Sequence, residues 1–214
     1  MRALEILAAD AAYARRFAEL IPQLVRATGP VSYDYQFGTR PRFFADFITA
    51  AWLAPGTLFS HGVARIAIRD GELAGLELGF HGPDFYPLRE ALAQVSAQLV
   101  SGGRATISEL RALAARAERA SYLNAHIPEG VYYVHALSVP EPLRGHGIGA
   151  RLLENAILRA RETGQRSLQL DVLADNPAVR FYESMGLRVL CETRSPELSR
   201  EHGFPSELRM EVRV

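Results

Sequence analysis

Lysine is absent from this 214-residue chain, and other residue types that mark particular protein classes are scarce or balanced. All 24 basic residues are arginine, which we attribute to GC-rich coding that also explains the abundant alanine. The single cysteine, Cys191, excludes an internal disulfide, and its place in a predicted strand indicates inert core. The 24 acidic residues balance the arginines, which argues against a nucleic-acid binder that relies on counterion release.

Long hydrophobic runs are also missing. Glu5 and Asp10 interrupt the apolar N-terminal stretch, so we predict no signal peptide, and no run approaches the length that spans a membrane. We therefore expect a cytoplasmic protein that has neither nucleic acid nor a membrane as partner. The length predicts a single domain over residues 1–214, including any insertion, with an extensive core.

The most informative segment is residues 144–149, which read Arg-Gly-His-Gly-Ile-Gly. Residues 131–139 before it are rich in aromatic and β-branched side chains and predict a buried strand. After it, apolar residues recur at helical spacing, so the glycines are expected at a helix N-terminus. Unpaired N–H groups and the helix dipole bind phosphate there, glycine permits close approach, and Arg144 adds a cation. The segment predicts a pyrophosphate site.

Two alternatives compete with this prediction. The spacing Gly145-x-Gly147-x-x-Ala150 also satisfies the dinucleotide fingerprint, and Asp171 lies near the expected acidic position. However, residues 140–144 separate the strand from the first glycine, and Asp171 falls inside a predicted strand rather than at its end. The other alternative is a glycine-rich helix start that binds nothing, but three alternating glycines after an arginine are costly to keep for structure alone.

A second segment, residues 174–187, follows the Asp171 strand. Asn176 is predicted to cap a helix that Gly186 ends, with Pro177 in its first turn. Together the two segments resemble the GNAT N-acetyltransferase superfamily. Its acetyl-CoA loop reads Arg/Gln-x-x-Gly-x-Gly/Ala, and its following motif reads Asn-x-x-Ala-x-x-x-Tyr-x-x-x-Gly-Phe with small variations. The matching residues over roughly 130–190 are Arg144, Gly147 and Gly149, then Asn176, Tyr182 and Gly186, with Leu187 where phenylalanine is usual.

The resemblance implies an α/β (α+β) fold with a mixed, strongly twisted central sheet flanked by helices. Residues 83–128, between the third and fourth strands, depart from that layout: the family usually has a short turn there, whereas the patterning predicts a helical insertion. The patterning predicts a first helix with Tyr13, Phe17, Leu20, Ile21 and Leu24 on one stripe, a second helix ended by Pro55-Gly56, and strands at about 60–69, 72–80, 131–139, 167–174, 187–194 and 207–213.

The insertion itself is predicted to hold two helices. One carries Leu88, Leu92, Val95 and Leu99; the other opens with a capping box at residues 106–109 and turns Leu110, Leu113, Ala114 and Ala117 inward. This pair either covers the sheet, or forms a wall of the acceptor pocket or an oligomer surface.

The resemblance further implies an acetyl-CoA-dependent N-acetyltransferase that acts on a primary amine and uses no metal. The residues expected to hold acetyl-CoA (coenzyme A) are Leu137, Ser138, Val139, Arg144, Gly145, His146, Gly147, Ile148, Gly149, Asn176 and Tyr182. Tyr182 matches the general acid of the family, since a tyrosine of pKa about 10 stays protonated at neutral pH. Aromatic packing is the alternative for Tyr182. The N–H of Val139 is the expected partner of the thioester carbonyl.

His135 is the predicted general base, because imidazole accepts a proton at a pKa of about 6.5. Residues 135–139 resemble the His-Ala-Leu-Ala-Val strand of arylalkylamine N-acetyltransferases, with Tyr133 where a companion histidine would stand. A hydrogen-bonded core histidine is the competing interpretation.

The acceptor is expected to contact the loop at residues 32–38. Tyr33, Tyr35 and Phe37 would bind an apolar amine and Asp34 its cation, unless these residues form a packed loop. A small-molecule amine is the first expectation, and a protein or peptide amine the second. A non-catalytic CoA-binding regulatory module and a dinucleotide-dependent oxidoreductase are the readings from other classes, and a homodimer stays open.

Overall fold

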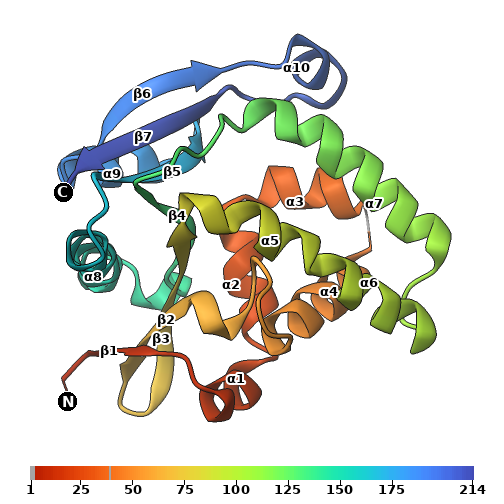
Figure 1. The fold of residues 1–214 in the computed structure, drawn as a ribbon, viewed down its shortest axis with the longest axis horizontal. Coiled ribbons are helices and arrows are strands. Elements are labelled where there is room, and N and C mark those ends of the chain that lie inside the picture. The colour runs from red at the N-terminus through yellow and green to blue at the C-terminus, as the bar shows by residue number, and fades with distance from the viewer. Residues whose placement is uncertain (1–2, 39) are drawn as a thin grey trace.

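A mixed, seven-stranded sheet forms the centre of the computed structural model, which describes residues 3–38 and 40–214 (Figure 1). The strands are β1 Glu5–Ala8, β2 Ala64–Arg69, β3 Glu72–His81, β4 Val131–Ser138, β5 Ser167–Leu173, β6 Arg188–Thr193 and β7 Glu207–Arg213. Their spatial order is β1-β2-β3-β4-β5-β7-β6. Strands β4 and β5 pair in parallel, and the other described pairs are antiparallel. This sheet confirms the predicted fold class.

Helices cover both faces of the sheet. They are α1 Ala11–Phe17, α2 Ile21–Thr28, α3 Pro30–Phe37, α4 Pro41–Leu53, α5 Phe85–Glu90, α6 Leu92–Ser101, α7 Ile107–Ala120, α8 Ile148–Glu162, α9 Ala178–Ser184 and α10 Pro196–His202. Helix α8 packs on one face against β1 to β5, whereas α2 packs against β4 on the other. Figure 1 shows α8 on one side of the sheet and the group α2 to α7 opposite. Strands β2 to β5 are thereby largely buried from both sides, whereas β6 at the edge is exposed.

Two of the predicted hairpin and capping signals are present in the structure. Asp70 and Gly71 both have positive φ, 52° and 84°, which suits the tight turn that joins β2 to β3. Thr106 and Glu109 make both hydrogen bonds of the capping box that opens α7. Short-range sequence chemistry therefore determines where these elements begin.

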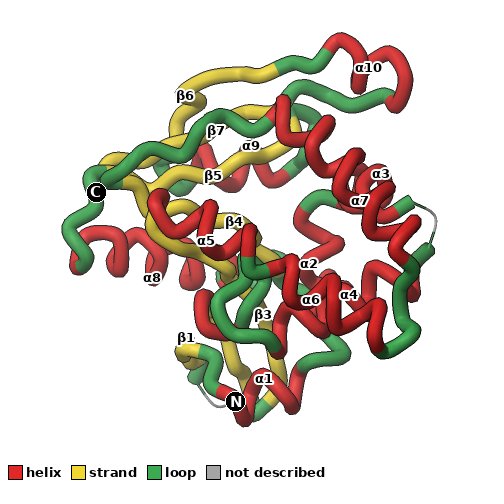
Figure 2. Tube along the Cα trace, turned by 45° about the vertical axis from the view of Figure 1, so that its right-hand side comes forward, coloured by secondary structure: helices red, strands yellow, loops and turns green. Residues whose placement is uncertain are grey.

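The helical insertion lies between β3 and β4, as predicted, but it contains three helices. The expected single helix over Leu88 to Leu99 is interrupted at Ala91, which separates α5 from α6. Ala114, predicted to face inward, is exposed on α7. Figure 2 shows α7 running beside α3, so the insertion packs on the N-terminal helices as well as on the sheet.

Other predictions near the termini were wrong. The expected first helix is two helices, because Pro22 sits in the first turn of α2 and the chain turns before it; Leu20 is exposed there. Residues 32–38, expected to be a loop, belong mostly to α3. Cys191, expected in the core, is exposed because β6 is an edge strand with a solvated surface. Strand β1 and helix α10 were not predicted.

A buried polar cluster joins the sheet to α8. The Tyr132 hydroxyl donates to Glu77 Oε1 at 2.9 Å, and Arg159 Nη1 donates to Glu77 Oε2 at 3.1 Å. The Arg159 guanidinium also lies 4.9 Å from the centre of the Tyr132 ring. Burial raises the pKa of the Glu77 carboxyl, while Arg159 and the Tyr132 hydrogen bond oppose that rise. Removing either partner would leave a buried carboxylate short of donors.

Candidate active site

The site forms where β4 and β5 diverge. Their pairing ends at Val134 and Leu170. On its other edge β4 remains paired with β3 as far as Ser138, and β5 remains paired with β7 as far as Leu173. The ends of the two strands therefore border an opening between them, whose backbone groups are available to a ligand.

A β-bulge at His135 accompanies this divergence. Val134 and Ala136 pair with adjacent residues of β3, so His135 is an extra residue in β4. A bulge bends its strand and re-aims side chains. The His135 ring lies 5.2 Å from the ring of Phe59 and 6.1 Å from that of Phe80, and Ala136 is buried in the same cluster.

The glycine loop follows β4 after the short 3-10 turn Glu141–Leu143. Gly145 and Gly147 both have φ of 77°, a conformation that favours glycine, and Gly147 caps α8. Among the described residues, no atom lies within 4 Å of a Cβ built on either glycine, so the space above them is open. Arg144 Nε donates to the Val139 carbonyl at 3.1 Å and fixes the loop to the strand end. The first N–H groups of α8 lack helical acceptors, so this cradle suits a phosphate group.

Helix α9 supplies the second half of the predicted motif. Asn176 Oδ1 accepts a hydrogen bond of 2.9 Å from the N–H of Ala178, the first residue of α9, but the N-cap is Pro177, one residue later than predicted. Gly186 has φ of 88° just beyond the end of α9. Tyr182 is 8 % exposed, and burial raises its pKa to about 12. Its phenol is therefore protonated at every physiological pH.

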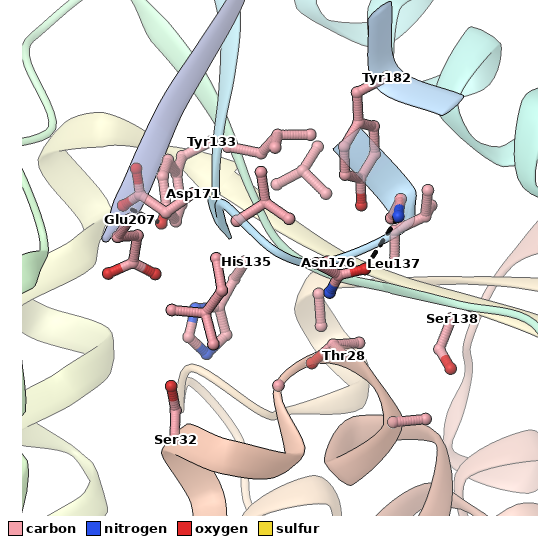
Figure 3. A pocket seen from close by; sticks show the side chains of 18 of the residues that line it. Thr28, Ser32, Tyr133, His135, Leu137, Ser138, Asp171, Asn176, Tyr182 and Glu207 are labelled. Atoms are coloured by element: carbon pink, nitrogen blue, oxygen red, sulfur yellow. Dashed lines mark hydrogen bonds between the residues drawn. The ribbon is translucent and has the colours of Figure 1, made fainter. Parts of the chain in front are cut away.

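One cavity of about 1200 Å³ connects these parts. Predicted site residues that line it are His135, Leu137, Ser138, Val139, Arg144, Gly145, Gly147, Ile148, Gly149, Asn176 and Tyr182. His146 does not line it: the side chain is exposed, with Nδ1 2.9 Å from the Arg144 carbonyl. In Figure 3, Tyr182 and Asn176 lie on one side of the cavity and Glu207 on the other, with His135 between them.

His135 faces the cavity as a neutral imidazole. Burial lowers its pKa to about 4, and the nearby Asp171 carboxylate only partly offsets that effect. Its Nε2 atom is buried and has no hydrogen-bond partner among the described residues. The alternative considered from the sequence, a hydrogen-bonded core histidine, would require a partner that this nitrogen lacks among the described residues. A base of such low pKa is weak at neutral pH.

The opposite end of the cavity holds a charged network. The Tyr133 hydroxyl donates to Asp171 Oδ2 at 2.9 Å, and Arg209 Nη2 donates to the same oxygen at 2.8 Å. Arg209 Nε also pairs with Asp171 Oδ1. These contacts hold Asp171 within the protein, so it cannot serve as the ribose-binding acid of a dinucleotide fold. Glu207, at the start of β7, lines the cavity next to them.

The expected acceptor residues are separated by the folding of α3. Tyr33 lines the cavity, but Phe37 is buried in the core and Tyr35 packs against Phe204 at 5.2 Å. Asp34 forms an ion pair with Arg26 at 2.6 Å on the surface. Glu207, an acidic residue that lines the cavity, was not predicted, because a single charged residue at a strand start carries no distinctive local signal.

The residues that the structure describes contain no group of three or more His, Cys, Asp or Glu side chains arranged to hold a metal ion. No helix within residues 3–38 and 40–214 combines the length and apolar character needed to cross a membrane.

Comparison with known proteins gives a consistent result. A family model described as "Acetyltransferase (GNAT) family" matches residues 34–187. No curated protein matches the chain.

Several solved structures share the fold. An N-acetyltransferase from Staphylococcus aureus Mu50 aligns with a TM-score of 0.71 at 14% identity, covering 97% of this chain and 100% of that chain. A polyamine N-acetyltransferase from Drosophila melanogaster that forms N-acetylagmatine aligns with a TM-score of 0.59 at 17% identity, covering 99% and 100%. The ribosomal-protein-S18-alanine N-acetyltransferase from Escherichia coli aligns with a TM-score of 0.53 at 15% identity, covering 99% and 94%. At these identities the likeness concerns the fold.

Proposed function

The chain belongs to the GNAT acetyltransferase family, and we propose that it transfers the acetyl group of acetyl-CoA to the primary amine of a small molecule, with Tyr182 as general acid. The observation that carries this proposal is the single cavity that joins the glycine cradle, the opening between β4 and β5, and Tyr182. One ligand can therefore contact all three at once.

The cradle suits the pyrophosphate of acetyl-CoA. The open space over Gly145 and Gly147 admits phosphate oxygens to the N–H groups at the start of α8, and Arg144 adds positive charge beside them. The pantetheine arm would then follow Leu137 to Val139 along the free edge of β4. This path brings the thioester to the opening between the strands.

Two groups would act on the thioester. Val139 follows the last paired residue of β4, which supports the assignment of its N–H as the group that polarises the thioester carbonyl while the carbonyl oxygen gains charge. Attack by the amine breaks the carbon–sulfur bond and leaves a thiolate. Tyr182 can give that thiolate a proton, because a phenol whose pKa is raised to about 12 is still protonated when the reaction begins.

The helical insertion favours a small acceptor over a polypeptide. Helix α7 is tied to α3 by the bond from Arg116 Nε to the Gln36 carbonyl, at 2.7 Å. It is tied to α10 by ion pairs from Arg119 to Glu197 and Glu201. These contacts hold α7, which lines the cavity through Ala117 and Ala120, against α3 and α10, and this supports a small acceptor over a polypeptide.

His135 was the base predicted from the sequence, and it is placed at the opening between the strands. With its pKa near 4, it can relay a proton through water but holds one poorly at neutral pH. Another group in the cavity is therefore needed as the main proton acceptor.

An acetylation screen tests the proposed function. Monoamines, polyamines, amino acids and short peptides are incubated with acetyl-CoA, and free thiol release is compared with the mass of the acetylated product. We expect turnover with small cationic amines and little with peptides. Preferred acetylation of peptides would contradict the small-molecule assignment, and acetyl-CoA binding without thiol release for any amine would indicate a regulatory module.

A further inference from the structure

The acceptor end of the cavity contains a carboxylate whose nearest cation is already occupied. Arg209 lies two residues after Glu207 on β7 and therefore on the same face of the strand. All five of its N–H donors, however, are used within the protein. Two bond Asp171, one bonds Gln169 Oε1 at 3.1 Å, and two bond backbone carbonyls of residues 125–126 at 2.6 and 3.0 Å. None is left to pair with Glu207.

Glu207 accepts one hydrogen bond in the part of the chain that the structure describes, from Asn124 Nδ2 to Oε2 at 3.2 Å. An amide donates without neutralising a charge. Glu207 is partly buried, and a carboxylate that loses water in this way is stabilised by a cation or a proton. The cavity is the side from which either can arrive.

The other titratable groups around Glu207 leave its charge in place. Asp171 and Arg209 cancel each other as an ion pair. Tyr133 stays protonated because burial, and then Asp171, raises its pKa, and His135 stays neutral because burial lowers its pKa to about 4. Glu207, when ionised, is thus the one of these groups whose charge is not offset by an ion pair.

Aromatic side chains form part of the wall of this end of the cavity. Tyr33 comes from α3, Phe59 precedes β2, and Phe85 and Tyr86 come from α5. Arg89, also on α5, is exposed. Aromatic faces pack well on an apolar body and also attract cations.

Resting on the acetyl transfer proposed above, we propose that the acceptor enters as a cationic amine with an apolar or aromatic body, and that Glu207 holds its ammonium group and removes its first proton. This assigns a substrate class and a proton acceptor to the same carboxylate. It also excludes acceptors that carry an anionic group beside the amine, because like charges would meet at Glu207.

The proton balance of the step is complete. The ammonium gives one proton to a Glu207 carboxylate oxygen, and the freed nitrogen lone pair forms a bond to the thioester carbon. As the carbon–sulfur bond breaks, the thiolate takes the Tyr182 phenol proton. The second proton leaves the nitrogen and restores the phenol through water, and Glu207 returns its proton to solvent. The products are the N-acetyl amine, the free thiol and one proton.

The acidity of Glu207 suits this role. Burial, and then Asp171, raise its pKa and Arg209 lowers it, which together bring the pKa to about 7. A carboxylate of this pKa accepts a proton near neutrality, where an ordinary glutamate does not. The rate should therefore rise with pH through an apparent pKa close to 7.

The test uses a variant and a matched acceptor series. Glu207→Gln keeps the size of the side chain and an acceptor for Asn124, and Glu192→Gln, on the exposed surface of β6, is the control. The acceptors are 2-phenylethylamine, phenylalaninamide and phenylalanine, which share a ring but differ in the group beside the amine. Initial rates of thiol release are measured from pH 5.5 to 9, with acetyl-CoA affinity by calorimetry and melting temperature alongside.

We expect Glu207→Gln to lower kcat/KM for 2-phenylethylamine by about 100-fold or more and to abolish the rise near pH 7, with acetyl-CoA affinity unchanged. Glu192→Gln should behave as the wild type. For the wild type, phenylalanine should be at least about tenfold poorer than phenylalaninamide, a comparison that does not depend on any variant folding.

The inference is overturned if Glu207→Gln keeps the wild-type KM and pH profile, if phenylalanine equals its amide, or if none of the three acceptors reacts while other amines do. Failure of the proposed function is a different result: the wild type would then release no thiol with any amine.

Discussion

Replacing Tyr182 with phenylalanine is the most informative single change, because it removes one proton donor and leaves the ring. The ring packs against Phe181 at 5.2 Å and belongs to the core beneath α8 and α9. No hydrogen bond to the hydroxyl is found among the described residues, so its loss leaves no partner unsatisfied. The melting temperature and the affinity for acetyl-CoA should therefore stay close to those of the wild type.

Turnover should respond strongly. A positioned general acid contributes about 10²- to 10⁴-fold, so kcat of Tyr182→Phe should fall by about 100-fold or more, or about 2.7 kcal/mol. The assay is thiol release at saturating acetyl-CoA and amine, with Tyr122→Phe as control because Tyr122 is 76% exposed and lies outside the cavity. Since the pKa of Tyr182 is about 12, the wild-type profile should show no downturn from this group below about pH 10. Wild-type kcat in the variant across the pH range would refute the assignment and reduce Tyr182 to a packing residue.

Three further outcomes follow from the geometry. Gly147→Asp should raise the Kd of acetyl-CoA at least about tenfold, or about 1.4 kcal/mol, and Gly147→Asn, of equal size without charge, should do less; unchanged calorimetric affinity for the Asp variant would contradict the cradle. Histidine takes up a proton near pH 6.5 in the unfolded chain, but His135 does so only near pH 4 in the folded protein, so the wild type should lose stability as the pH falls from about 6.5 to 4. In His135→Ala the melting temperature should fall less over this pH range. An equal fall in both proteins would show that His135 is not desolvated. Tyr132→Phe should lower the free energy of unfolding by about 1–3 kcal/mol in urea titrations, because buried Glu77 loses a donor; a change under about 0.5 kcal/mol would mean that water replaces it.

The glycine cradle and α9 were predictable because their signals are local. Arg144 to Gly149 form one contiguous stretch in which backbone conformation, helix start and charge are all specified by neighbouring residues. Asn176 and Gly186 likewise mark the two ends of one short helix. Capping and turn chemistry act over a few residues, so the sequence displays them directly.

The chemistry of the acceptor end was not predictable, because it depends on pairing between distant strands. The bulge at His135 follows from the register of β4 on β3, and the pKa of His135 follows from burial that a sequence does not reveal. Glu207 reaches the cavity only because β7 pairs with the end of β5. Asp34 was predicted to bind the cation of the acceptor, but it lies on α3, where it forms an ion pair with Arg26.

A crystal structure of the complex with coenzyme A would test the central claim most directly. We predict that the pyrophosphate lies on the N–H groups of residues 145–149 and that pantetheine follows β4 into the opening beyond Val134. The sulfur should come within hydrogen-bonding reach of the Tyr182 hydroxyl, roughly 3–3.5 Å. A coenzyme bound elsewhere, or a sulfur turned away from Tyr182 with the hydroxyl buried among side chains, would contradict the account.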